Sequence, residues 1–489
     1  MTVTPNIGGL AAEHAANFRS DIYTPTDLFK TVNAKINTQN EYLNAFISIT
    51  NEDAREAAEA ATQRIKSGET GALIGIPIAV KDLLNTAGQR TTAGSKMLEH
   101  FVPVQDSTVV QKLKDAGLVI VGKTNLDEFA MGSSNEYSAY GPVHNPWDLS
   151  RVPGGSSGGS AATVAARGVP LSIGTDTGGS IRQPAALCGV MGLKPTYGRV
   201  SRFGVVAFAS SLDQVGPFAR DANDMADLLQ VIAGHDEKDS TSSLEPVPDF
   251  KSAFNRGFDG IKIGIPSELL QEGVDDDVLE SFERAIHEFE TRGAIINRDI
   301  SIPSIRAALP VYYLIAPSEA SANLARYDGV KYGFSVLDGK NAEEVMSASR
   351  GMAFGPEVKR RIMIGTYALS AGYYDAYYLK AQKVRTVIQQ EFATALNEVD
   401  TILTPTTPTT AFEIDSKIHN PIEMYLNDLF TLPANIVGLP ALSTPCGFSD
   451  GLPIGLQMVG KAFGEADLIG YAYAYQSITD WHKSEPVDR

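Results

Sequence analysis

Short apolar runs alternate with helical patterns along this 489-residue chain, and that alternation restricts its fold more than any other feature. The runs expected to be strands are Ile74–Val80, Leu118–Val121, Leu171–Gly174, Ile261–Ile265, Ala294–Asn297 and Thr401–Leu403. The helices expected are residues 1–50, Glu52–Lys66, Ser107–Ala116, Ser160–Arg167, Asp275–Thr291 and Tyr373–Glu398. Chains that alternate strands and helices build layered α/β folds, so we predict a three-layer architecture.

The length allows two or three domains of about 150 residues each, or one large α/β unit. The acidic, Ser-rich segment Asp236–Asp249 is the best candidate boundary, and a surface loop would have the same composition. Residues near the carboxyl end also look like part of the functional site, which argues against a domain boundary at that segment. We therefore expect a single domain over 1–489, with a helical region at about 1–70 and a catalytic core at about 71–235. The remainder would complete the sheet and the substrate pocket.

The formal charge of −17 makes direct binding of a phosphate backbone an improbable main task for this chain. Two cysteines, Cys188 and Cys446, are too few for a disulfide scaffold and suit a reducing compartment. Residues 1–17 lack the basic and apolar regions of a signal peptide, and no apolar run is long enough to span a bilayer. We expect a soluble, cytoplasmic protein without a membrane segment.

A lysine, Lys81, follows the apolar run Ile74–Val80 directly. A lysine buried at the end of a strand loses hydration, and this lowers its pKa towards a neutral amine that can accept a proton. Taken alone, Lys81 could equally extend to solvent or pair with the neighbouring Asp82. Its position therefore predicts a base only in combination with other candidate catalytic residues.

Two Gly- and Ser-rich stretches supply candidate partners for Lys81. Ser156 lies within Gly154–Ser160, where the glycines indicate unusual backbone dihedrals or a close approach. Ser180 ends the run Thr177-Gly178-Gly179-Ser180, whose consecutive backbone N–H groups could form an anion-binding nest beside a hydroxyl. A plain tight turn is the competing interpretation of each stretch.

Other catalytic motifs fit less well. Gly154–Gly158 matches the G-x-S-x-G nucleophile elbow, but the preceding His144–Asp148 is polar and turn-like where an apolar strand is needed. No Gly-Lys-Ser/Thr follows the glycines at the spacing of a phosphate-binding loop. The seven histidines form no H-x-x-x-H pair, so we expect no metal site, and Cys188 looks like a small core residue.

Together, Lys81, Ser156 and Ser180 agree in order and spacing with the amidase signature family, which the stretch from Gly154 to about Met191 resembles. The resemblance implies a large mixed β-sheet covered by helices on both faces. It also implies a Ser–cis-Ser–Lys triad, with Ser180 as nucleophile, Ser156 as bridge and Lys81 as base. A cis peptide would lead into Ser156. The oxyanion hole implied by the family consists of the backbone N–H groups of Thr177, Gly178 and Gly179.

Further motifs resemble the branch of this family that serves as the A subunit of tRNA-dependent amidotransferases. They are Gly192–Ser201, Ser211–Pro217, Glu319–Gly329, Glu357–Ile362, Gly372–Tyr378, Leu432–Asn435 and Pro453–Gln457. The resemblance implies a glutaminase without a cofactor of its own in a carbon–nitrogen ligase complex. Its ammonia would pass to a partner that amidates Glu-tRNA(Gln) or Asp-tRNA(Asn). The B and C subunits of the amidotransferase are the implied partners, with ATP, Mg²⁺ and the misacylated tRNA held mainly by them.

Glutamine carries an α-carboxylate and an α-ammonium group, so its pocket should offer one cation and one anion. From the matching motifs we expect Arg361 at the carboxylate, Asp428 at the ammonium and Tyr312 as a hydrogen-bonding wall. Arg360 and Tyr313 are close rivals, and each charged residue could instead form an ordinary ion pair. A stand-alone amidase acting on another carboxamide is the alternative function. A non-catalytic structural subunit is a third, against which the intact Lys81, Ser156 and Ser180 argue.

Overall fold

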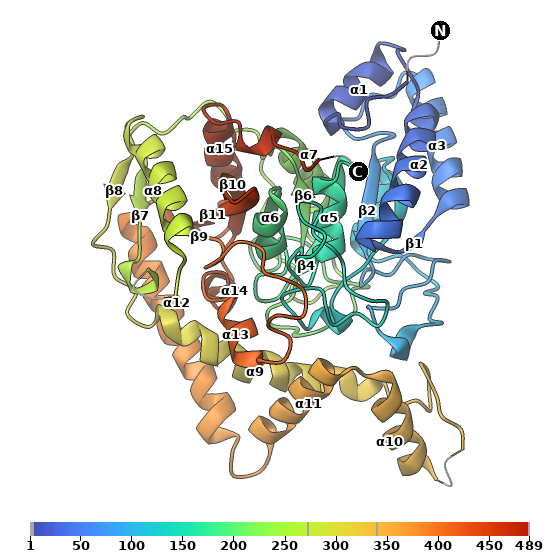
Figure 1. Cartoon of the computed structure of the whole chain (residues 1–489), viewed down its shortest axis with the longest axis vertical. Coiled ribbons are helices and arrows are strands. Elements are labelled where there is room, and N and C mark those ends of the chain that lie inside the picture. The colour runs from blue at the N-terminus through green and yellow to red at the C-terminus, as the bar shows by residue number, and fades with distance from the viewer. Residues whose placement is uncertain (1–3, 271–272, 339–340, 488–489) are drawn as a thin grey trace.

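A computed structural model describes residues 4–270, 273–338 and 341–487 of the chain. Its centre is an 11-stranded mixed sheet with the order β1-β3-β2-β4-β6-β5-β10-β11-β9-β7-β8 (Figure 1). The strands are β1 (Phe46–Ile49), β2 (Pro77–Lys81), β3 (Val119–Thr124), β4 (Leu171–Asp176), β5 (Met191–Lys194), β6 (Gln214–Ala219), β7 (Lys262–Gly264), β8 (Ile295–Asn297), β9 (Thr401–Pro405), β10 (Ala441–Ser449) and β11 (Leu452–Gly460).

Helices cover the sheet on both faces. Every residue of β2, β3, β4, β6 and β11 is buried, and because successive side chains point to opposite faces, both faces must be covered. The predicted α/β fold with three layers is therefore confirmed. The helices are α1 (Ala11–Arg19), α2 (Pro25–Leu43), α3 (Asn51–Lys66), α4 (Thr108–Asp115), α5 (Gly158–Ala165), α6 (Arg182–Cys188), α7 (Ala222–Ile232), α8 (Asp276–Glu290), α9 (Ala308–Asn323), α10 (Ala342–Ala353), α11 (Pro356–Leu369), α12 (Lys380–Glu398), α13 (Pro421–Leu426), α14 (Leu432–Val437) and α15 (Glu465–Gln476).

The sheet joins strands from distant parts of the sequence. Strand β2 pairs in parallel with β3 and β4, which brings their carboxyl ends to the same edge. Strand β10 pairs antiparallel with β5, with Ala441 opposite Lys194, and β11 continues the sheet on its other side. Residues on either side of the segment 236–249 thus form one continuous sheet. Among the described residues, no helix combines the length and apolar character needed to cross a membrane.

Most predicted elements are found within a few residues of the expected bounds, and three differ. Residues 1–50 are not helical throughout, because Phe46–Ile49 pairs with β3 as a strand. The strand expected from Ile74 begins only at Pro77, since Gly75 has a φ of +80° in the turn before it. The helix expected from Tyr373 starts with π-helical turns at Asp375–Leu379 (η6) before α12 begins.

Helices α10 and α11 and the first half of α12 project from the body of the molecule (Figure 1). Helix α11 is anchored to α9 by a very close contact at Gly365. A Cβ atom at that position would lie 1.9 Å from the carbonyl oxygen of Pro317, so only glycine allows the two backbones to meet. The contact fixes α11, whose buried face carries Arg361.

Candidate active site

The amine of Lys81 lies at the carboxyl end of β2, surrounded by three hydroxyl groups. Its Nζ atom is 2.8 Å from Ser156 Oγ, 2.9 Å from Ser157 Oγ and 2.9 Å from Thr175 Oγ1. All four side chains are buried. The structure therefore brings Lys81 and Ser156 into hydrogen-bonding contact and adds two partners that sequence reasoning did not identify.

Burial lowers the pKa of the Lys81 amine to about 7, although the carboxylates of Asp127 and Asp176 oppose this shift. The direction is the one expected for a lysine at the end of an apolar strand. The competing ion pair does not form, since Asp82 binds a second buried lysine, Lys123, at 3.1 Å. Lys81 is thus poised to be a neutral amine near neutral pH.

The turn that carries Ser156 contains the implied cis peptide, which joins Gly155 to Ser156. The Gly155 N–H donates to Oε1 of Gln183 at 2.8 Å. The carboxylate of Asp127 lies so close that a Cβ atom on Gly155 would be 2.1 Å from its Oδ2. Asp127 is in turn held by the backbone N–H groups of Asn135, at 2.9 Å, and Tyr137, at 3.1 Å. A glycine is therefore required at position 155.

Ser180 lies in the loop that follows β4 and is tied to the Ser156 turn. Its carbonyl oxygen accepts the N–H of Ser157 at 3.2 Å. The residue is 7% exposed, and its hydroxyl makes no hydrogen bond to a described residue. Ser180 is thus adjacent to Ser156 and open to a ligand, and its proton-transfer contact with Ser156 stays a prediction.

The carboxylate of Asp176 holds the Ser180 loop in shape. Its Oδ1 accepts the N–H of Gly179 at 2.8 Å, and its Oδ2 accepts the N–H of Ile181 at 3.2 Å. Burial alone would raise the pKa of Asp176, but the guanidinium of Arg182 outweighs it and holds this pKa at about 2. Asp176 is consequently an anion that fixes the backbone on both sides of Ser180.

The three N–H groups expected in the oxyanion hole are not equivalent. Gly179 already donates to Asp176, whereas the N–H groups of Thr177 and Gly178 meet no acceptor within the described chain. Tyr312 borders this loop, because a Cβ atom on Gly178 would lie 2.8 Å from its hydroxyl oxygen. That hydroxyl has no hydrogen-bond partner among the described residues, so it faces the loop as a free polar group.

Arg182 connects the Ser180 loop to segments far along the chain. Its nitrogen atoms donate to Thr431 O at 2.9 Å, Gln457 Oε1 at 2.6 Å and Asn435 Oδ1 at 2.6 Å. Asn435 Nδ2 in turn donates a hydrogen bond to Asp176 Oδ1 at 2.8 Å. The network is fully buried, so its polar groups satisfy one another without water.

Asp428 is buried beside Tyr313. Its Oδ2 accepts the hydroxyl of Ser133 at 2.7 Å and that of Tyr313 at 3.2 Å. Burial raises the pKa of Asp428 to about 7, while the Ser133 bond and the nearby Arg361 oppose the shift. Of the two neighbouring tyrosines, Tyr313 therefore contacts the expected anion and Tyr312 borders the Ser180 loop.

Arg361 is 2% exposed and lies near the rings of Tyr313 and Tyr425. Its Nε donates to Glu357 Oε1 at 2.7 Å, so an ion pair within α11 does form. Its two terminal nitrogens donate to no described residue. The guanidinium carbon lies 5.4 Å from the ring centre of Tyr313, as well as 5.6 Å from those of Tyr425 and Phe208. Arg360 also binds Glu357, but its side chain is 37% exposed.

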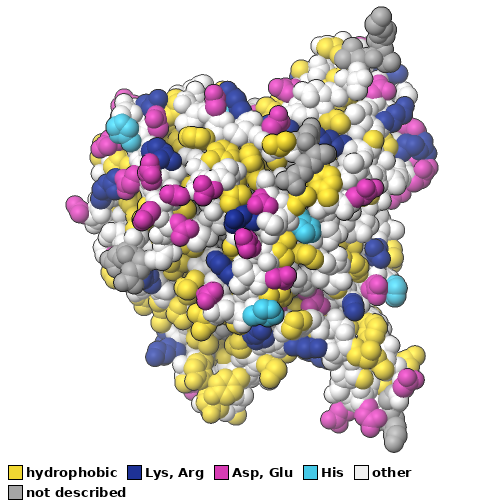
Figure 2. Space-filling view, in the orientation of Figure 1, with side chains coloured by type: hydrophobic (Ala, Val, Ile, Leu, Met, Phe, Trp, Pro, Cys, Tyr) yellow, Lys and Arg dark blue, Asp and Glu magenta, His cyan; other side chains and the backbone are white. Residues whose placement is uncertain are grey.

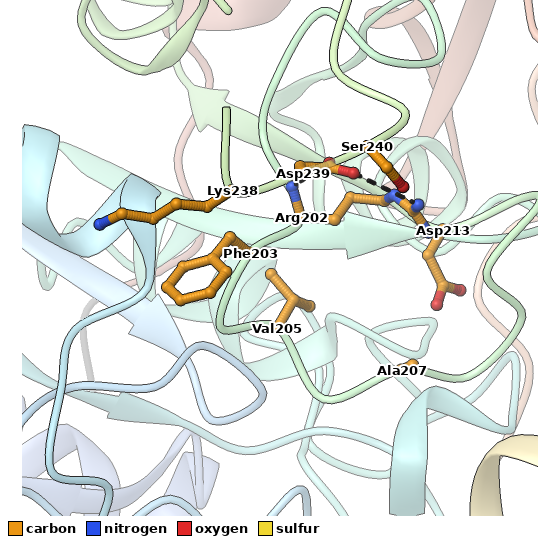
Figure 3. Close-up of a pocket in the computed structure, with 8 residues that line it drawn as sticks. All are labelled: Arg202, Phe203, Val205, Ala207, Asp213, Lys238, Asp239 and Ser240. Carbon is orange, nitrogen blue, oxygen red and sulfur yellow. Dashed lines mark hydrogen bonds and ion pairs between the residues drawn. The ribbon is translucent and has the colours of Figure 1, made fainter. Parts of the chain in front are cut away.

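A cavity of about 200 Å³ lies beside Asp213 (Figure 3). It is lined by Arg202, Phe203, Val205, Ala207, Asp213, Lys238, Asp239 and Ser240. Asp213 links it to the Ser180 loop, because its Oδ1 accepts the Thr177 hydroxyl at 2.7 Å. None of Tyr312, Arg361 and Asp428 lines this cavity, so it is separate from the expected glutamine pocket.

Both cysteines are buried thiols, and burial raises the pKa of Cys188, which fits its prediction as a core residue. Within the described parts of the chain, no three His, Cys, Asp or Glu side chains are grouped to hold a metal ion.

Sequence reasoning missed the residues that position the site rather than those that would react. Besides Ser157 and Thr175, they are Asp127, Ser133, Asp176, Arg182 and Glu357. Asp176 and Arg182 flank Ser180 within one motif, and Glu357 precedes Arg361 by one helical turn, so local signals existed for these three. Ser133 and Asp127 are recognisable only from the fold.

Known proteins resemble this chain over nearly its whole length. The model of the Amidase family matches residues 27–469. The chain is 55% identical over 475 residues to the A subunit of the glutamyl-tRNA(Gln) amidotransferase of Alkalilimnicola ehrlichii, covering 97% of this chain and 98% of that relative. The crystal structure of the same subunit from Thermotoga maritima has a TM-score of 0.81 and 43% identity, covering 100% of this chain and 98% of the other. The native peptide amidase from Stenotrophomonas maltophilia has a TM-score of 0.83 and 31% identity, covering 98% of each. The chain belongs to the amidase family.

Proposed function

We propose that this chain is the glutaminase subunit of a tRNA-dependent amidotransferase, corresponding to the A subunit of its relatives. It hydrolyses glutamine to glutamate and ammonia and passes the ammonia to a partner subunit. The observation that carries the proposal is the Lys81 amine, which lies among three hydroxyls with its pKa lowered to about 7. The similarity to these amidotransferase subunits over nearly the whole chain supports the choice of substrate.

The hydrogen bonds around Lys81 favour one direction of proton transfer. A neutral amine has two N–H donors and one lone pair. The Ser157 hydroxyl donates to Thr175 O at 3.0 Å, so it can only accept from Lys81. With the second N–H directed to Thr175 Oγ1, the lone pair faces Ser156. Lys81 thus takes the proton of Ser156, and Ser156 takes that of Ser180.

The reaction follows from this relay. Ser180 Oγ attacks the amide carbon and its proton moves through Ser156 to Lys81. The N–H groups of Thr177 and Gly178 stabilise the oxyanion, with Gly179 as the third expected donor. The relay then returns the proton to the leaving nitrogen, the C–N bond breaks and ammonia departs. Water hydrolyses the acyl-enzyme by the same route. The Ser180–Ser156 contact tightens when substrate binds, as is common for catalytic hydrogen bonds.

Glutamine binds between two buried charges that both lie near Tyr313. Arg361 holds its α-carboxylate with the terminal nitrogens that have no partner in the described chain, and Glu357 fixes the guanidinium. Asp428 holds the α-ammonium, supported by the hydroxyl of Ser133. Tyr312 forms a polar wall beside the Ser180 loop. Charge-assisted bonds of this kind orient a small zwitterion for attack.

The ammonia is used by the partner B and C subunits, which also hold ATP, Mg²⁺ and the misacylated tRNA. The net charge of −17 fits a chain that leaves nucleic acid to its partner. The complex acts in the cytoplasm, where tRNA is charged.

A stand-alone amidase is the second candidate, favoured by the structural similarity to the peptide amidase. The buried Arg361 and Asp428 argue against it, because an apolar amide offers no charged partner to the terminal nitrogens of Arg361 or to the carboxyl of Asp428. Comparing glutamine with peptide and aryl amides as substrates of the purified chain distinguishes the two.

The decisive experiment is an ammonia assay on the chain co-expressed with the B and C subunits. We expect glutamine hydrolysis that Ser180→Ala abolishes, and amidation of the tRNA that ammonium restores in the Ser180→Ala complex. Ammonia release that persists in the purified Ser180→Ala complex would overturn the assignment of the nucleophile.

A further inference from the structure

Tyrosines gather at the free end of the projection that α11 and α12 form. Tyr367, Tyr373, Tyr374 and Tyr377, here called the tyrosine tip, are 51%, 42%, 43% and 38% exposed. The ring centres of Tyr367 and Tyr373 are 4.4 Å apart, and Tyr377 lies 5.9 Å and 6.0 Å from them. Hydrophobic side chains gather on the lower projection left of centre in Figure 2, where Figure 1 places this hairpin. Large exposed apolar patches of this kind usually mark interaction sites.

Helix α11 presents opposite faces to the pocket and to solvent. Arg361 and Gly365 are on the buried face, against Tyr313 and α9. Met363, which is 71% exposed, and Tyr367 lie four residues apart on the outer face, so they form one stripe that leads to the tyrosine tip. Tyrosine and methionine are enriched at the centres of protein interfaces.

The α11–α12 hairpin, residues 356–385, carries a charge opposite to that of the chain. Residues 356–385 contain six Lys and Arg and two Asp and Glu, whereas the whole chain has a net charge of −17. One of the two acids, Glu357, is buried and bound to Arg360 and Arg361. The exposed surface beside the tip therefore presents Lys380 and Lys383, with Asp375 as the one exposed acid of this segment. It is complementary to an acidic surface.

Three kinds of binding partner can be compared for how well they match this patch. A second copy docked tip to tip would bring like charges together. RNA would need open ring faces for its bases, but the Tyr367 and Tyr373 rings pack on each other, as do those of Tyr374 and Tyr378 at 5.4 Å. Met363 adds apolar surface on which no base stacks. An acidic protein surface with an apolar groove fits the whole patch.

We propose that the tyrosine tip and the Met363 stripe of α11 are the docking surface for a partner protein that offers an acidic, apolar groove. This inference rests on the proposed function, since it identifies the occupant with one of the two partner subunits of the amidotransferase. The aromatic tip fills the groove, and the lysines beside it pair with acids at its rim.

The test measures binding of the full chain to its co-expressed B and C subunits. The variant Met363→Ser/Tyr373→Ser/Tyr377→Ser removes the apolar surface, and Lys380→Glu/Lys383→Glu reverses the charge. The control is Val104→Ser/Leu244→Ser, which removes exposed apolar side chains outside the projection. We expect the Kd to rise at least about tenfold in both tip variants, as for loss of interface anchors, and to stay within about twofold in the control. Glutamine hydrolysis by the isolated chain should not change, which shows that the variants fold.

The outcomes separate this inference from the proposed function. Parental affinity in both tip variants overturns the docking surface while leaving the glutaminase intact. Absence of glutamine hydrolysis in every form of the complex overturns the proposed function instead. Binding of an oligonucleotide that only the tip variants lose would assign the patch to RNA. Self-association that only the tip variants lose would assign it to a second copy of the chain. Either result would also overturn the inference.

Discussion

Asp127 fits so closely against Gly155 that a Cβ atom on the glycine would lie 2.1 Å from the carboxylate oxygen Oδ2. The backbone N–H of Asp127 also lies 3.3 Å from Ser156 O, so the aspartate holds both residues of the cis peptide. The position of the Ser156 hydroxyl beside Lys81 therefore depends on an acid that takes no part in the proposed proton relay.

Gly155→Ala should destabilise the protein by ~1–3 kcal/mol, because the added methyl group displaces Asp127 from a fully packed site. It should also abolish glutamine hydrolysis by moving Ser156. Urea unfolding and the ammonia assay measure the two effects. Gly351→Ala in α10 is the matched control, since a Cβ atom there meets nothing within 4 Å. An active, fully stable Gly155→Ala protein would refute the role of this contact.

The pH dependence of glutamine hydrolysis should report two groups with pKa values of about 7. Below that pH Lys81 becomes protonated and cannot accept a proton, and Asp428 becomes neutral and cannot bind the ammonium. We expect log(kcat/KM) to fall towards low pH with a slope approaching two. In Asp428→Asn the slope should approach one, with a higher KM. A profile that is flat down to pH 5 would contradict both assignments.

Lys81 should also affect how stability varies with pH. Its pKa is about 7 in the fold and 10.5 for an ordinary lysine, so between these pH values the unfolded chain binds a proton that the native state does not. The free energy of unfolding therefore rises with pH over this window. Lys81→Met should reduce that rise, although other buried lysines keep part of it. Urea unfolding at pH 7 to 10 tests this, and Lys66→Met, at an exposed lysine, is the control. If the free energy of unfolding rises equally with pH in Lys81→Met and in the parent, Lys81 is not neutral in the fold.

Arg361→Ala should raise the KM for glutamine more than it lowers kcat, since the α-carboxylate is held in both the ground state and the transition state. Loss of a charge-assisted bond costs ~1.5–3 kcal/mol, which corresponds to about 10- to 150-fold in KM. Arg360→Ala is the control, because its side chain is 37% exposed and shares the same acid, Glu357. An equal effect of the two substitutions, or an effect on kcat alone, would assign the carboxylate to another residue.

The central strands show what the sequence could and could not reveal about the fold. β2 and β3 are apolar runs, so hydrophobicity predicts them directly. β10 is also largely buried, but it consists mainly of Ala, Ser, Thr, Gly and Pro, and Pro445 lies where its pairing register with β11 shifts. The strand conformation of β10 depends on packing between its neighbours rather than on a local pattern.

The candidate site divides in the same way. Lys81, Ser156 and Ser180 occur in recognisable motifs, and the structure brings the first two into contact. The bond between Ser133 and Asp428 joins residues 295 positions apart, and no periodicity marks either of them. Whether Tyr312 or Tyr313 reaches Asp428 is decided by the rotation of α9, which adjacent positions in a sequence cannot specify. Nothing local distinguishes Arg361 from Arg360 either, until α9 defines the inner face of α11.

The Arg182 network has a consequence for biosynthesis. Lys81, Ser156 and Ser180 leave the ribosome early, whereas the acceptors of Arg182 at Thr431, Asn435 and Gln457 are among the last residues translated. Until they arrive, Arg182 is held only by Asp176, and the Ser180 loop lacks its contacts with Thr431, Asn435 and Gln457. We therefore expect a nascent chain, or one truncated before Thr431, to hydrolyse no glutamine, so that activity begins only when synthesis is almost complete.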